Sequence, residues 1–533
     1  MSHSMIYVVG SGPAGVSCAM ALLQKGVQVT LLDLGLELDA RASDQLVKLQ
    51  SLGPEKWQSS DLAFLKAGTS AGLGGIPLKY AYGSDFPYRD PGVDWRLEMD
   101  GVETRPSFAK GGLSTVWGAA ILPYRAEDIR DWPIGEHDLA SHYRAVLEFM
   151  PVAGCHDLLE RLFPLYSECP QTLTPSSQAN DFLQDLGAAS EELKREGILF
   201  GASRLAMWAQ SGHRGAGCCY CGQCMYGCPY GLIYSSAHTL DVLRQHPNFT
   251  YRNNVAVDRL VENGDKVTLF AHDVSTHDKL QLQASRVFLA CGVLATTKIL
   301  LESLEAFNEP VILRDSCYFL LPLLRLRASS DVSRERLHTL AQVFLEILDP
   351  RVCDQTVHLQ IYTYNDLYSL ALKKIFGPAF RLLEVPAAIL LDRLMLVQGY
   401  LPSAFSPSIR MELCKDPKSD SSTLRLSPSS NERTVPTLNK VVRKLRTNYK
   451  YLRAIPLQPM LRPGKPGRGF HSGGTFPMQT SPGKFQSDRY GRPNGFQRVH
   501  AVDSTVFPGV PATTITLSVM ANAHRIGSSI GDY

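Results

Sequence analysis

The apolar and polar residues near the amino end follow the pattern of a βαβ unit. Residues 6–9 (IYVV) form a short apolar run that is typical of a buried strand. After a glycine-rich turn, Val16, Ala19 and Leu23 recur at the spacing of one helix face. Residues 27–33 (VQVTLLD) then form a second strand pattern that ends in an acidic residue. This order predicts two parallel strands joined by a helix.

Further strands and helices are predicted along the chain. Residues 286–303 read as a strand, a glycine turn and a helix, and residues 357–364 and 394–402 read as strands. The strongly apolar stretch 367–394 between the last two reads as helical. We expect a helical cap packed on a sheet, and an interfacial helix that gives access to a lipid or lipid-linked substrate is the alternative. Lys373, Lys374 and Arg381, which lie beside the apolar residues, favour that alternative.

The turn inside the βαβ pattern has the spacing of a dinucleotide-binding fingerprint. Gly10 permits the tight turn, Gly12 lets the backbone approach a pyrophosphate, and Gly15 lets the helix pack closely on the strand. The helix N-terminus faces the phosphate charge, and Asp33 would accept hydrogen bonds from ribose hydroxyls. This stretch alone does not distinguish NAD from FAD. The predicted nucleotide contacts are Gly10, Gly12, Pro13, Ala14, Gly15 and Asp33.

Composition adds few constraints. The 533 residues carry a net charge of +3, which by itself gives no argument for binding nucleic acid or a membrane surface. No apolar run is long enough to span a bilayer, so no transmembrane segment is expected. The first strand pattern starts so early that we expect no signal peptide. The protein is therefore expected in the cytoplasm, with export to the periplasm on a partner's signal as the alternative.

Five of the twelve cysteines lie within eleven positions of the stretch CCYCGQCMYGCPYG, residues 218–231. Cys218, Cys221, Cys224 and Cys228 satisfy Cys-x2-Cys-x2-Cys-x3-Cys-Pro, the bacterial ferredoxin spacing. We expect an iron–sulfur cluster of the 3Fe-4S or 4Fe-4S type. A bare or disulfide-linked cysteine loop and a tetrahedral zinc site remain alternatives.

Five further motifs lie at 110–120 (KGGLSTVWGAA), 130–146 (RDWPIGEHDLASHYRAV), 286–303 (RVFLACGVLATTKILLES), 469–478 (GFHSGGTFPM) and 499–526. Together, and in this order, they resemble the glucose–methanol–choline (GMC) oxidoreductase family, and within it the FAD-dependent sugar dehydrogenase catalytic subunits. In those subunits a Cys-Cys-x4-Cys-x3-Cys-Pro arrangement, which includes Cys219, Cys224 and Cys228 here, carries a three-iron cluster.

The resemblance implies an α/β fold with a Rossmann-like FAD-binding domain built from discontinuous segments. It also implies an α+β substrate domain with an antiparallel sheet. The implied order is 1–125 FAD-binding, 126–234 connecting region with the cysteines, 235–310 FAD-binding, 311–464 substrate domain, and 465–533 FAD-binding and catalytic segment.

The resemblance also assigns the catalytic pair. The family's His-x-x-Gly-Thr-x-x-Met pattern places the base at His471. The second position, usually Asn or His, falls on Thr514, whose hydroxyl can donate a hydrogen bond but cannot take a proton as His can. His471 would then be the sole base. Further flavin contacts are implied at Gly111, Gly112, Ser114, Trp117, Val255, Asp503, Thr505 and Thr516.

A basic segment precedes the histidine. Residues 433–468 hold ten Lys or Arg and no Asp or Glu. We expect a solvated helix face, with docking of an anionic substrate or an acidic electron acceptor as the alternative. No nucleic-acid module accompanies this charge, so nucleic acid is not an expected partner.

These observations favour an FAD-dependent dehydrogenase that oxidises a CH–OH group of a sugar or related alcohol, including an anionic or lipid-linked one. Its electrons would leave through the cysteine cluster to an external cytochrome, quinone or protein. The alternative is an oxygen-using GMC oxidase of a lipid-like or long-chain alcohol, in which the cysteines are only structural.

Overall fold

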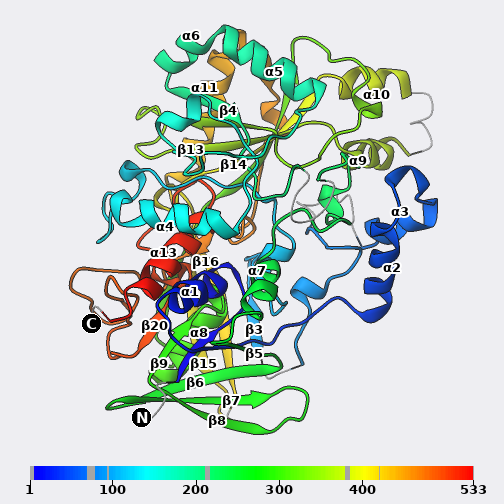
Figure 1. Cartoon of the computed structure of the whole chain (residues 1–533). Coiled ribbons are helices and arrows are strands. Elements are labelled where there is room, and N and C mark those ends of the chain that lie inside the picture. Colours follow the sequence, from blue (N-terminus) through cyan, green and yellow to red (C-terminus); the bar gives the residue numbers. More distant parts are fainter. Residues whose placement is uncertain are drawn as a thin grey trace.

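The computed structural model of the chain describes residues 5–68, 78–92, 95–210, 217–377, 384–418 and 421–531. Its nucleotide-binding half is built on a five-stranded parallel sheet in the order β20-β9-β1-β2-β5 (Figure 1). Segments from the beginning, the middle and the end of the sequence therefore form one sheet, as the discontinuous Rossmann-like prediction requires. The strands are β1 (Ile6–Val9), β2 (Val29–Leu32), β5 (Phe249–Arg252), β9 (Arg286–Leu289) and β20 (Val499–Ala501).

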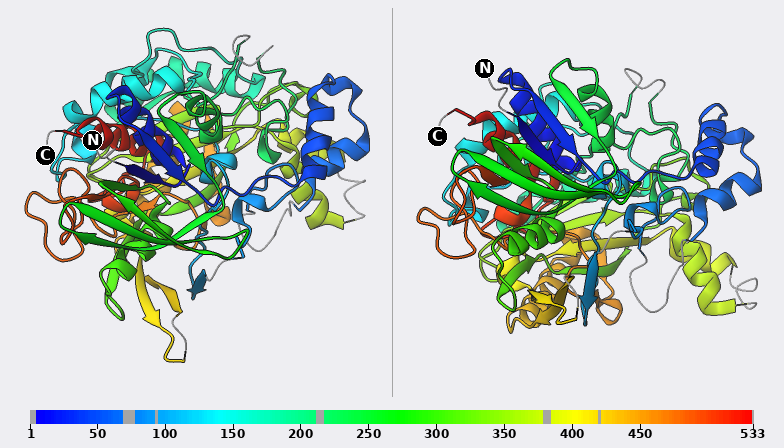
Figure 2. Two further views of the ribbon diagram at one scale, coloured as in Figure 1. Left: turned by 60° about the horizontal axis from the view of Figure 1, so that its bottom comes forward. Right: turned by 90° about the horizontal axis from the view of Figure 1, so that it is seen from below.

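Helices from both ends of the sequence pack together beside this sheet. Helix α1 (Pro13–Gln24) follows β1, and α13 (Thr516–Ser528) lies along it, as the neighbouring blue and red helices of Figure 2 show. A Cβ atom on Gly527 would lie only 2.9 Å from the backbone oxygen of Cys18, so the glycine permits this close approach. Helices α7 (Ser236–Leu243) and α8 (Val293–Ser303) also belong to this half.

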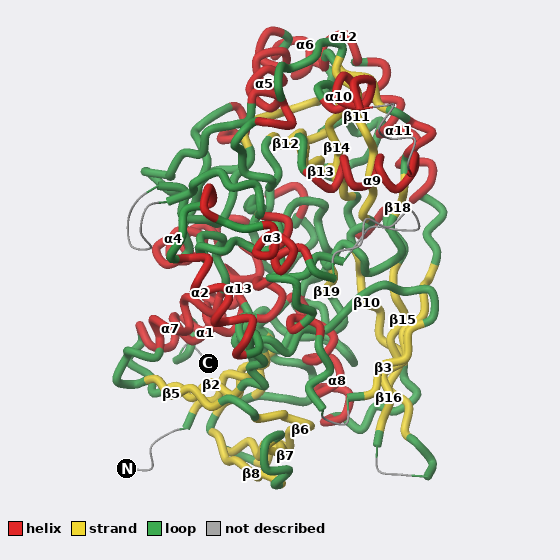
Figure 3. The backbone as a smooth tube through the Cα atoms, turned by 90° about the vertical axis from the view of Figure 1, so that its right-hand side faces the viewer, coloured by secondary structure: helices red, strands yellow, loops and turns green. Residues whose placement is uncertain are grey.

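Two smaller sheets border the nucleotide-binding half (Figure 3). A three-stranded antiparallel meander consists of β6 (Val255–Asn263), β7 (Lys266–Asp273) and β8 (Lys279–Ala284). A mixed five-stranded sheet in the order β19-β10-β15-β16-β3 consists of β19 (Ser472–Gly473), β10 (Pro310–Asp315), β15 (Ser408–Lys415), β16 (Ser422–Ser429) and β3 (Arg96–Met99).

The other half is built on a seven-stranded antiparallel sheet with two different faces. Phe319, Leu359 and Val397 point to one face, where they belong to an apolar core. The alternate residues Gln360 and Gln398 line a cavity on the opposite face, as the period of two in a strand requires. The strands, in order, are β17 (Ala454–Pro456), β11 (Tyr318–Arg325), β14 (Leu394–Tyr400), β13 (Val357–Tyr362), β12 (Val343–Ile347) and β4 (Ile198–Ala202), and β18 (Arg462–Pro463) also pairs with β11.

Helix α11 (Thr434–Thr447) carries four of the ten basic residues of the predicted basic segment. Its apolar face, including Val441 and Leu445, packs into the core of the seven-stranded sheet. Lys444 is buried and bonds to Asp349 and Glu196 at 2.7 Å each. The basic segment is therefore not a uniformly solvated face, because one of its charges is buried in an ion-pair network.

The remaining helices cover the edges of the molecule. The apolar stretch 367–394 forms two helices, and its Arg381 lies outside the described residues. No described helix is long and apolar enough to cross a membrane. These helices are α2 (Ala40–Gln50), α3 (Ser59–Lys66), α4 (Glu136–Phe149), α5 (Ser177–Ala188), α6 (Ser190–Arg195), α9 (Asp366–Phe376), α10 (Glu384–Leu391) and α12 (Tyr449–Leu452).

Candidate active site

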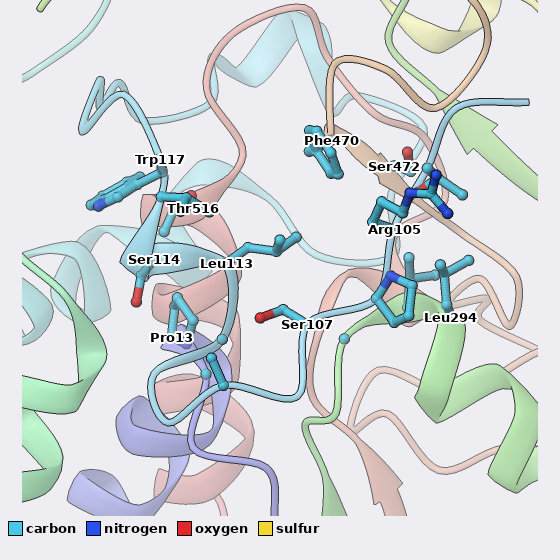
Figure 4. A pocket seen from close by; sticks show the side chains of 18 of the residues that line it. Pro13, Arg105, Ser107, Leu113, Ser114, Trp117, Leu294, Phe470, Ser472 and Thr516 are labelled. Carbon is cyan, nitrogen blue, oxygen red and sulfur yellow. The ribbon is translucent and has the colours of Figure 1, made fainter. Parts of the chain in front are cut away.

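A cavity of about 590 Å³ lies between the parallel sheet and the seven-stranded sheet. Residues of the β1–α1 turn, residues 112–120 and α13 line its nucleotide-binding side. Residues of β11, β13 and β14 and the loop before β19 line its other side. Figure 4 shows Pro13 and Ser114 on one side of the cavity and Phe470, Ser472 and Arg105 on the other. The cavity can therefore hold a nucleotide and a second molecule against different walls.

The first glycine turn fits a bound dinucleotide. Gly10 has φ +101°, a conformation that favours glycine. A Cβ atom on Gly15 would lie 1.8 Å from the backbone oxygen of Gly10, so this glycine is needed for helix packing. At Gly12 the only protein atom near a Cβ would be the Ala290 oxygen, at 3.9 Å, and φ is an ordinary −63°. The protein itself leaves room at Gly12, and a phosphate above the N-terminus of α1 would use that room.

Asp33 follows β2 and is buried at the edge of the cavity. Its carboxylate accepts hydrogen bonds from the Ser11 hydroxyl and, at 3.2 Å, from the Tyr251 hydroxyl. Burial raises the pKa of Asp33 to about 6, although these hydrogen bonds oppose the rise. Neither Ser11 nor Tyr251 was predicted from the sequence: Ser11 occupies a variable position between the fingerprint glycines, and Tyr251 lies on β5, far along the chain.

The second glycine turn is joined to the first by serine hydroxyls. Gly111 (φ +90°) donates its N–H to Ser11 Oγ at 2.9 Å. Ser114 Oγ donates to the Gly111 oxygen and contacts Ser236 Oγ at 3.1 Å. Ser114 also lines the cavity, while Gly111 supports the wall from behind. Trp117 lines the cavity and donates its indole N–H to the Tyr234 oxygen at 2.7 Å.

The remaining predicted flavin contacts divide into two groups. Val255, Asp503 and Thr516 line the cavity. Asp503 is held by Thr296 Oγ1 at 2.5 Å and by its own N-cap bond from the Thr505 N–H at 2.9 Å. Thr505 is fully buried behind the cavity wall and does not line it. The prediction that Thr505 contacts the cofactor is therefore not supported, because its side chain faces the core.

The predicted base, His471, lies on the cavity wall next to the substrate-side sheet. Its ring stacks on the Tyr400 ring, with centroids 4.5 Å apart and an angle of 17° between the planes. Its Nδ1 atom is buried without a hydrogen-bond partner among the described residues. Burial, with a smaller contribution from the nearby His358, lowers the pKa of His471 to about 3. The imidazole is therefore neutral near pH 7 and able to accept a proton.

Thr514 lines the same cavity and is buried. Its Oγ1 accepts a hydrogen bond from the Leu122 N–H at 2.6 Å. A hydroxyl that already accepts a backbone hydrogen bond still has its own proton to donate. The side chain can therefore donate to an oxygen in the cavity, as predicted, and cannot replace His471 as a base.

Asp315 at the end of β10 fixes the loop that carries His471, and no sequence motif identifies it. Its Oδ2 accepts from the Gly467 N–H and its Oδ1 from the Ser472 hydroxyl, both at 2.7 Å. One buried carboxyl thus holds both ends of the short segment 467–472.

The Asp315 carboxyl also predicts a dependence of stability on pH. Burial raises its pKa to about 7, from an ordinary value of 3.8. Because the folded protein binds this proton more tightly than the unfolded chain, the stabilisation is complete below about pH 4 and is lost as the pH rises through 7. We expect the unfolding temperature of the apoprotein to fall over that interval, and Asp315→Asn to flatten the fall. An equally steep fall in the variant would contradict this assignment.

Four polar side chains on the substrate-side sheet were also missed by the sequence analysis. Gln360 on β13 lies directly opposite Gln398 on β14, and both line the cavity. Tyr318 on β11 lies opposite Tyr400 on β14, and both line it too. Gln398 donates to the Tyr400 hydroxyl at 2.5 Å. The alternation in residues 394–402 could have identified the Gln398–Tyr400 face, but not which strands lie beside it.

The five clustered cysteines are the predicted ligands of a metal centre. Among the described residues, no three His, Cys, Asp or Glu side chains converge closely enough to hold a metal ion, and all the cysteines are free. Cys219 and Cys221 are hydrogen-bonded to each other, which lowers the pKa of Cys219 to about 6. Burial raises the pKa of Cys218 to about 12 and that of Cys228 to about 11, so both favour the neutral thiol. A zinc site is not supported, and neither is an iron–sulfur cluster held by Cys218, Cys219, Cys221, Cys224 and Cys228.

Comparison with known proteins identifies the fold. Residues 109–309 match the family model of the GMC oxidoreductases. Pyridoxine 4-oxidase from Mesorbium loti has 14% identity and a TM-score of 0.63, with 99% of each chain covered. Formate oxidase has 13% identity and a TM-score of 0.60, with 100% of this chain and 99% of the other covered. A formate oxidase from Aspergillus oryzae RIB40 has 14% identity and a TM-score of 0.59, also with 100% of this chain and 99% of the other covered. No curated protein sequence matches the chain significantly.

The family match covers the second glycine turn, the cysteine loop and the β9–α8 segment. The likeness to solved structures extends over both sheets and the cavity between them. The room at Gly12 and the buried Asp33 fit the dinucleotide that such a fold binds. The protein thus has the GMC oxidoreductase fold and is an FAD-dependent oxidoreductase that acts on CH–OH donors.

Proposed function

We propose that the protein oxidises a CH–OH group of a sugar or a related alcohol to a carbonyl, with His471 as the base. The observation that carries this proposal is the position of a neutral imidazole on the cavity wall, with its Nδ1 atom buried and without a hydrogen-bond partner in the described part of the chain. The two glycine turns and Asp33 would hold FAD, which would supply the hydride acceptor for the reaction. The chain must supply the remaining functions: orientation of the alcohol, removal of its proton and exclusion of water.

His471 performs the proton transfer. With its pKa lowered to about 3, it is unprotonated throughout the neutral range, so it can accept the hydroxyl proton without first losing one. Its stacking on Tyr400 restricts rotation of the imidazole ring. The loop holding His471 is fixed by Asp315, which reduces the motion that would otherwise separate base and substrate.

Thr514 orients the substrate oxygen. Its acceptor function is used by Leu122, so its hydroxyl proton remains to bond the alcohol or developing carbonyl oxygen. Gln360 and Gln398 each carry an amide that can donate to and accept from further hydroxyl groups. A polyhydroxylated substrate would use this wall more fully than a simple alcohol.

The test is anaerobic reduction of the bound flavin. Purified holoprotein is mixed with a panel of sugars and sugar alcohols, and bleaching of the flavin absorbance is followed. Bleaching by at least one CH–OH donor, with the corresponding carbonyl as product, is the expected result. A failure of every donor in the presence of full flavin content would overturn the proposal.

For the route of the electrons, we propose an external acceptor reached through an iron–sulfur cluster in the cysteine loop. Its support is the spacing of the cysteines in the sequence. The thiols do not converge on one metal ion, so we derive no electron-transfer step through a cluster.

Iron and sulfide analysis with low-temperature EPR, on protein purified without oxygen, tests this relay. Stoichiometric iron with a cluster signal is the result that the relay predicts, and Cys224→Ser should then lower the iron content while FAD stays bound. Flavin without iron would overturn it and leave the oxygen-using oxidase, with structural cysteines. That alternative predicts hydrogen peroxide release under air.

A further inference from the structure

A buried arginine lies close to the catalytic histidine and is not used by the proposed chemistry. Arg468 lines the cavity, and only 8% of its surface is exposed. Its positive charge opposes the rise in pKa that burial causes in Tyr88, Tyr318 and Tyr400, which line the same cavity. Because Tyr400 stacks on His471, the positive charge lies on the same wall as the base.

Two arginines line this part of the cavity. Glu103 forms ion pairs with Arg468 at 3.8 Å and with Lys465 at 3.3 Å, and Lys465 is exposed and does not line the cavity. Arg105, on the neighbouring segment, also lines the cavity on this side (Figure 4). Two guanidinium groups therefore lie on a part of the wall that is otherwise built from phenols and amides. A guanidinium in such a place favours an anionic ligand that can bond to it.

The position of the arginine relative to the base is fixed. The Asp315 carboxyl bonds the Gly467 N–H on one side of Arg468 and the Ser472 hydroxyl just after His471. The Glu103 N–H bonds the Pro466 oxygen at 2.9 Å, which holds the start of the same loop. A ligand bonded to both residues would therefore have its two reacting groups held at a constant spacing.

The dinucleotide phosphates are not the natural partner of this arginine. They are expected at Gly12 and the N-terminus of α1, beside Pro13. Figure 4 shows Pro13 across the cavity from Phe470, the ring over which the Arg468 guanidinium lies at 5.7 Å. The anion that fits Arg468 therefore belongs to the second molecule in the cavity.

We propose that Arg468 binds an anionic group, a carboxylate or a phosphate, on the alcohol that His471 deprotonates. The substrate class is then a hydroxy acid or a phosphorylated alcohol, including the sugar forms of both. A guanidinium pairs with either group through two parallel hydrogen bonds, and the surrounding phenols can donate further ones. This inference names the substrate class of the site described under the proposed function and rests on that function.

The test measures anion binding separately from turnover. Holoprotein is titrated with acetate and with inorganic phosphate, neither of which can be oxidised here, and the change in the flavin absorbance spectrum is recorded. Saturable binding of at least one anion is expected. Arg468→Met should weaken it roughly 10- to 100-fold, the range for loss of a charged hydrogen-bonded pair. Arg468→Lys keeps the charge but cannot form two parallel hydrogen bonds, so its affinity for the anion should lie between those of the parent and Arg468→Met.

The matched control is Lys465→Met. Lys465 is the other cation paired with Glu103, and it is exposed and does not line the cavity. The anion affinity of this variant should stay within about twofold of the parent, because charges in water are screened. Absence of saturable binding, or equal weakening in both Met variants, would overturn the proposal. Flavin content, measured for each variant, separates loss of the subsite from loss of folding.

A second experiment distinguishes a carboxylate ligand from a phosphate ligand, and it tests the anion subsite separately from the proposed alcohol oxidation. Glycolate and glycerol 3-phosphate are compared with ethylene glycol and glycerol as reductants of the flavin. Faster reduction by the carboxylate or by the phosphate, abolished in Arg468→Met, supports the subsite and names its ligand. Equal rates for neutral and charged alcohols would refute the subsite while upholding alcohol oxidation. Anion binding without any reduction would uphold the subsite and count against the proposed function.

Discussion

Replacing His471 by alanine should slow substrate-driven flavin reduction by about 10²- to 10⁴-fold, the usual contribution of a general base. The residue lies on the cavity wall, and Thr514 cannot accept the proton in its place. The loss should appear in the rate of flavin reduction at saturating substrate, because the missing interaction serves proton transfer rather than binding. Stopped-flow absorbance under anaerobic conditions measures it.

The same experiment has an internal control for folding. Flavin content of His471→Ala should match the parent, because the glycine turns and Asp33 that form the dinucleotide site are unchanged, while loss of the stacking on Tyr400 lowers the unfolding temperature. Added imidazole should restore part of the rate by entering the space left by the ring. A rate within threefold of the parent would show that another group removes the proton. With a pKa of about 3 for His471, the parent should show no loss of activity from protonation of its base between pH 8 and pH 5.

Gly15→Ala should give a protein that does not retain FAD. A methyl group at this position would lie 1.8 Å from the Gly10 oxygen and 3.4 Å from Ala290 Cβ, so α1 could not remain against the turn. Displacement of the helix would remove the phosphate site at its N-terminus and disturb the contact of α1 with α13. The absorbance ratio of flavin to protein after gel filtration measures the loss.

Gly187→Ala provides the matched control, because the same change is made in α5, where a Cβ atom would meet nothing within 4 Å. This variant should retain full flavin and gain up to about 1 kcal/mol of stability, since alanine favours a helix over glycine. If Gly15→Ala bound FAD as well as Gly187→Ala does, the close approach at Gly15 would not be required for the site.

The sequence predicted those parts of the site that depend on local geometry. The glycine fingerprint identified the turn after β1, and periodicity identified β13 and β14. Asp315 escaped prediction because its partners, Gly467 and Ser472, lie more than 150 positions away. For the cysteines, local spacing predicts a cluster, but among the described residues their thiols do not converge on one metal ion. A motif fixes the order of the thiols, whereas the backbone between them decides how close together they lie. The pairing of Gln360 with Gln398 likewise depends on the register of strands separated by two helices.

The order of strands in the parallel sheet has a consequence for synthesis on the ribosome. Strand β20 and helix α13 come from the last part of the sequence, yet they lie beside β9 and α1, which are made much earlier. The amino-terminal βαβ unit must therefore leave the exit tunnel and wait, with one flank of α1 uncovered, until residue 528 has followed. Flavin can be captured only after translation has passed this point, and chaperones that shield α1 in the interval should raise the yield of holoprotein.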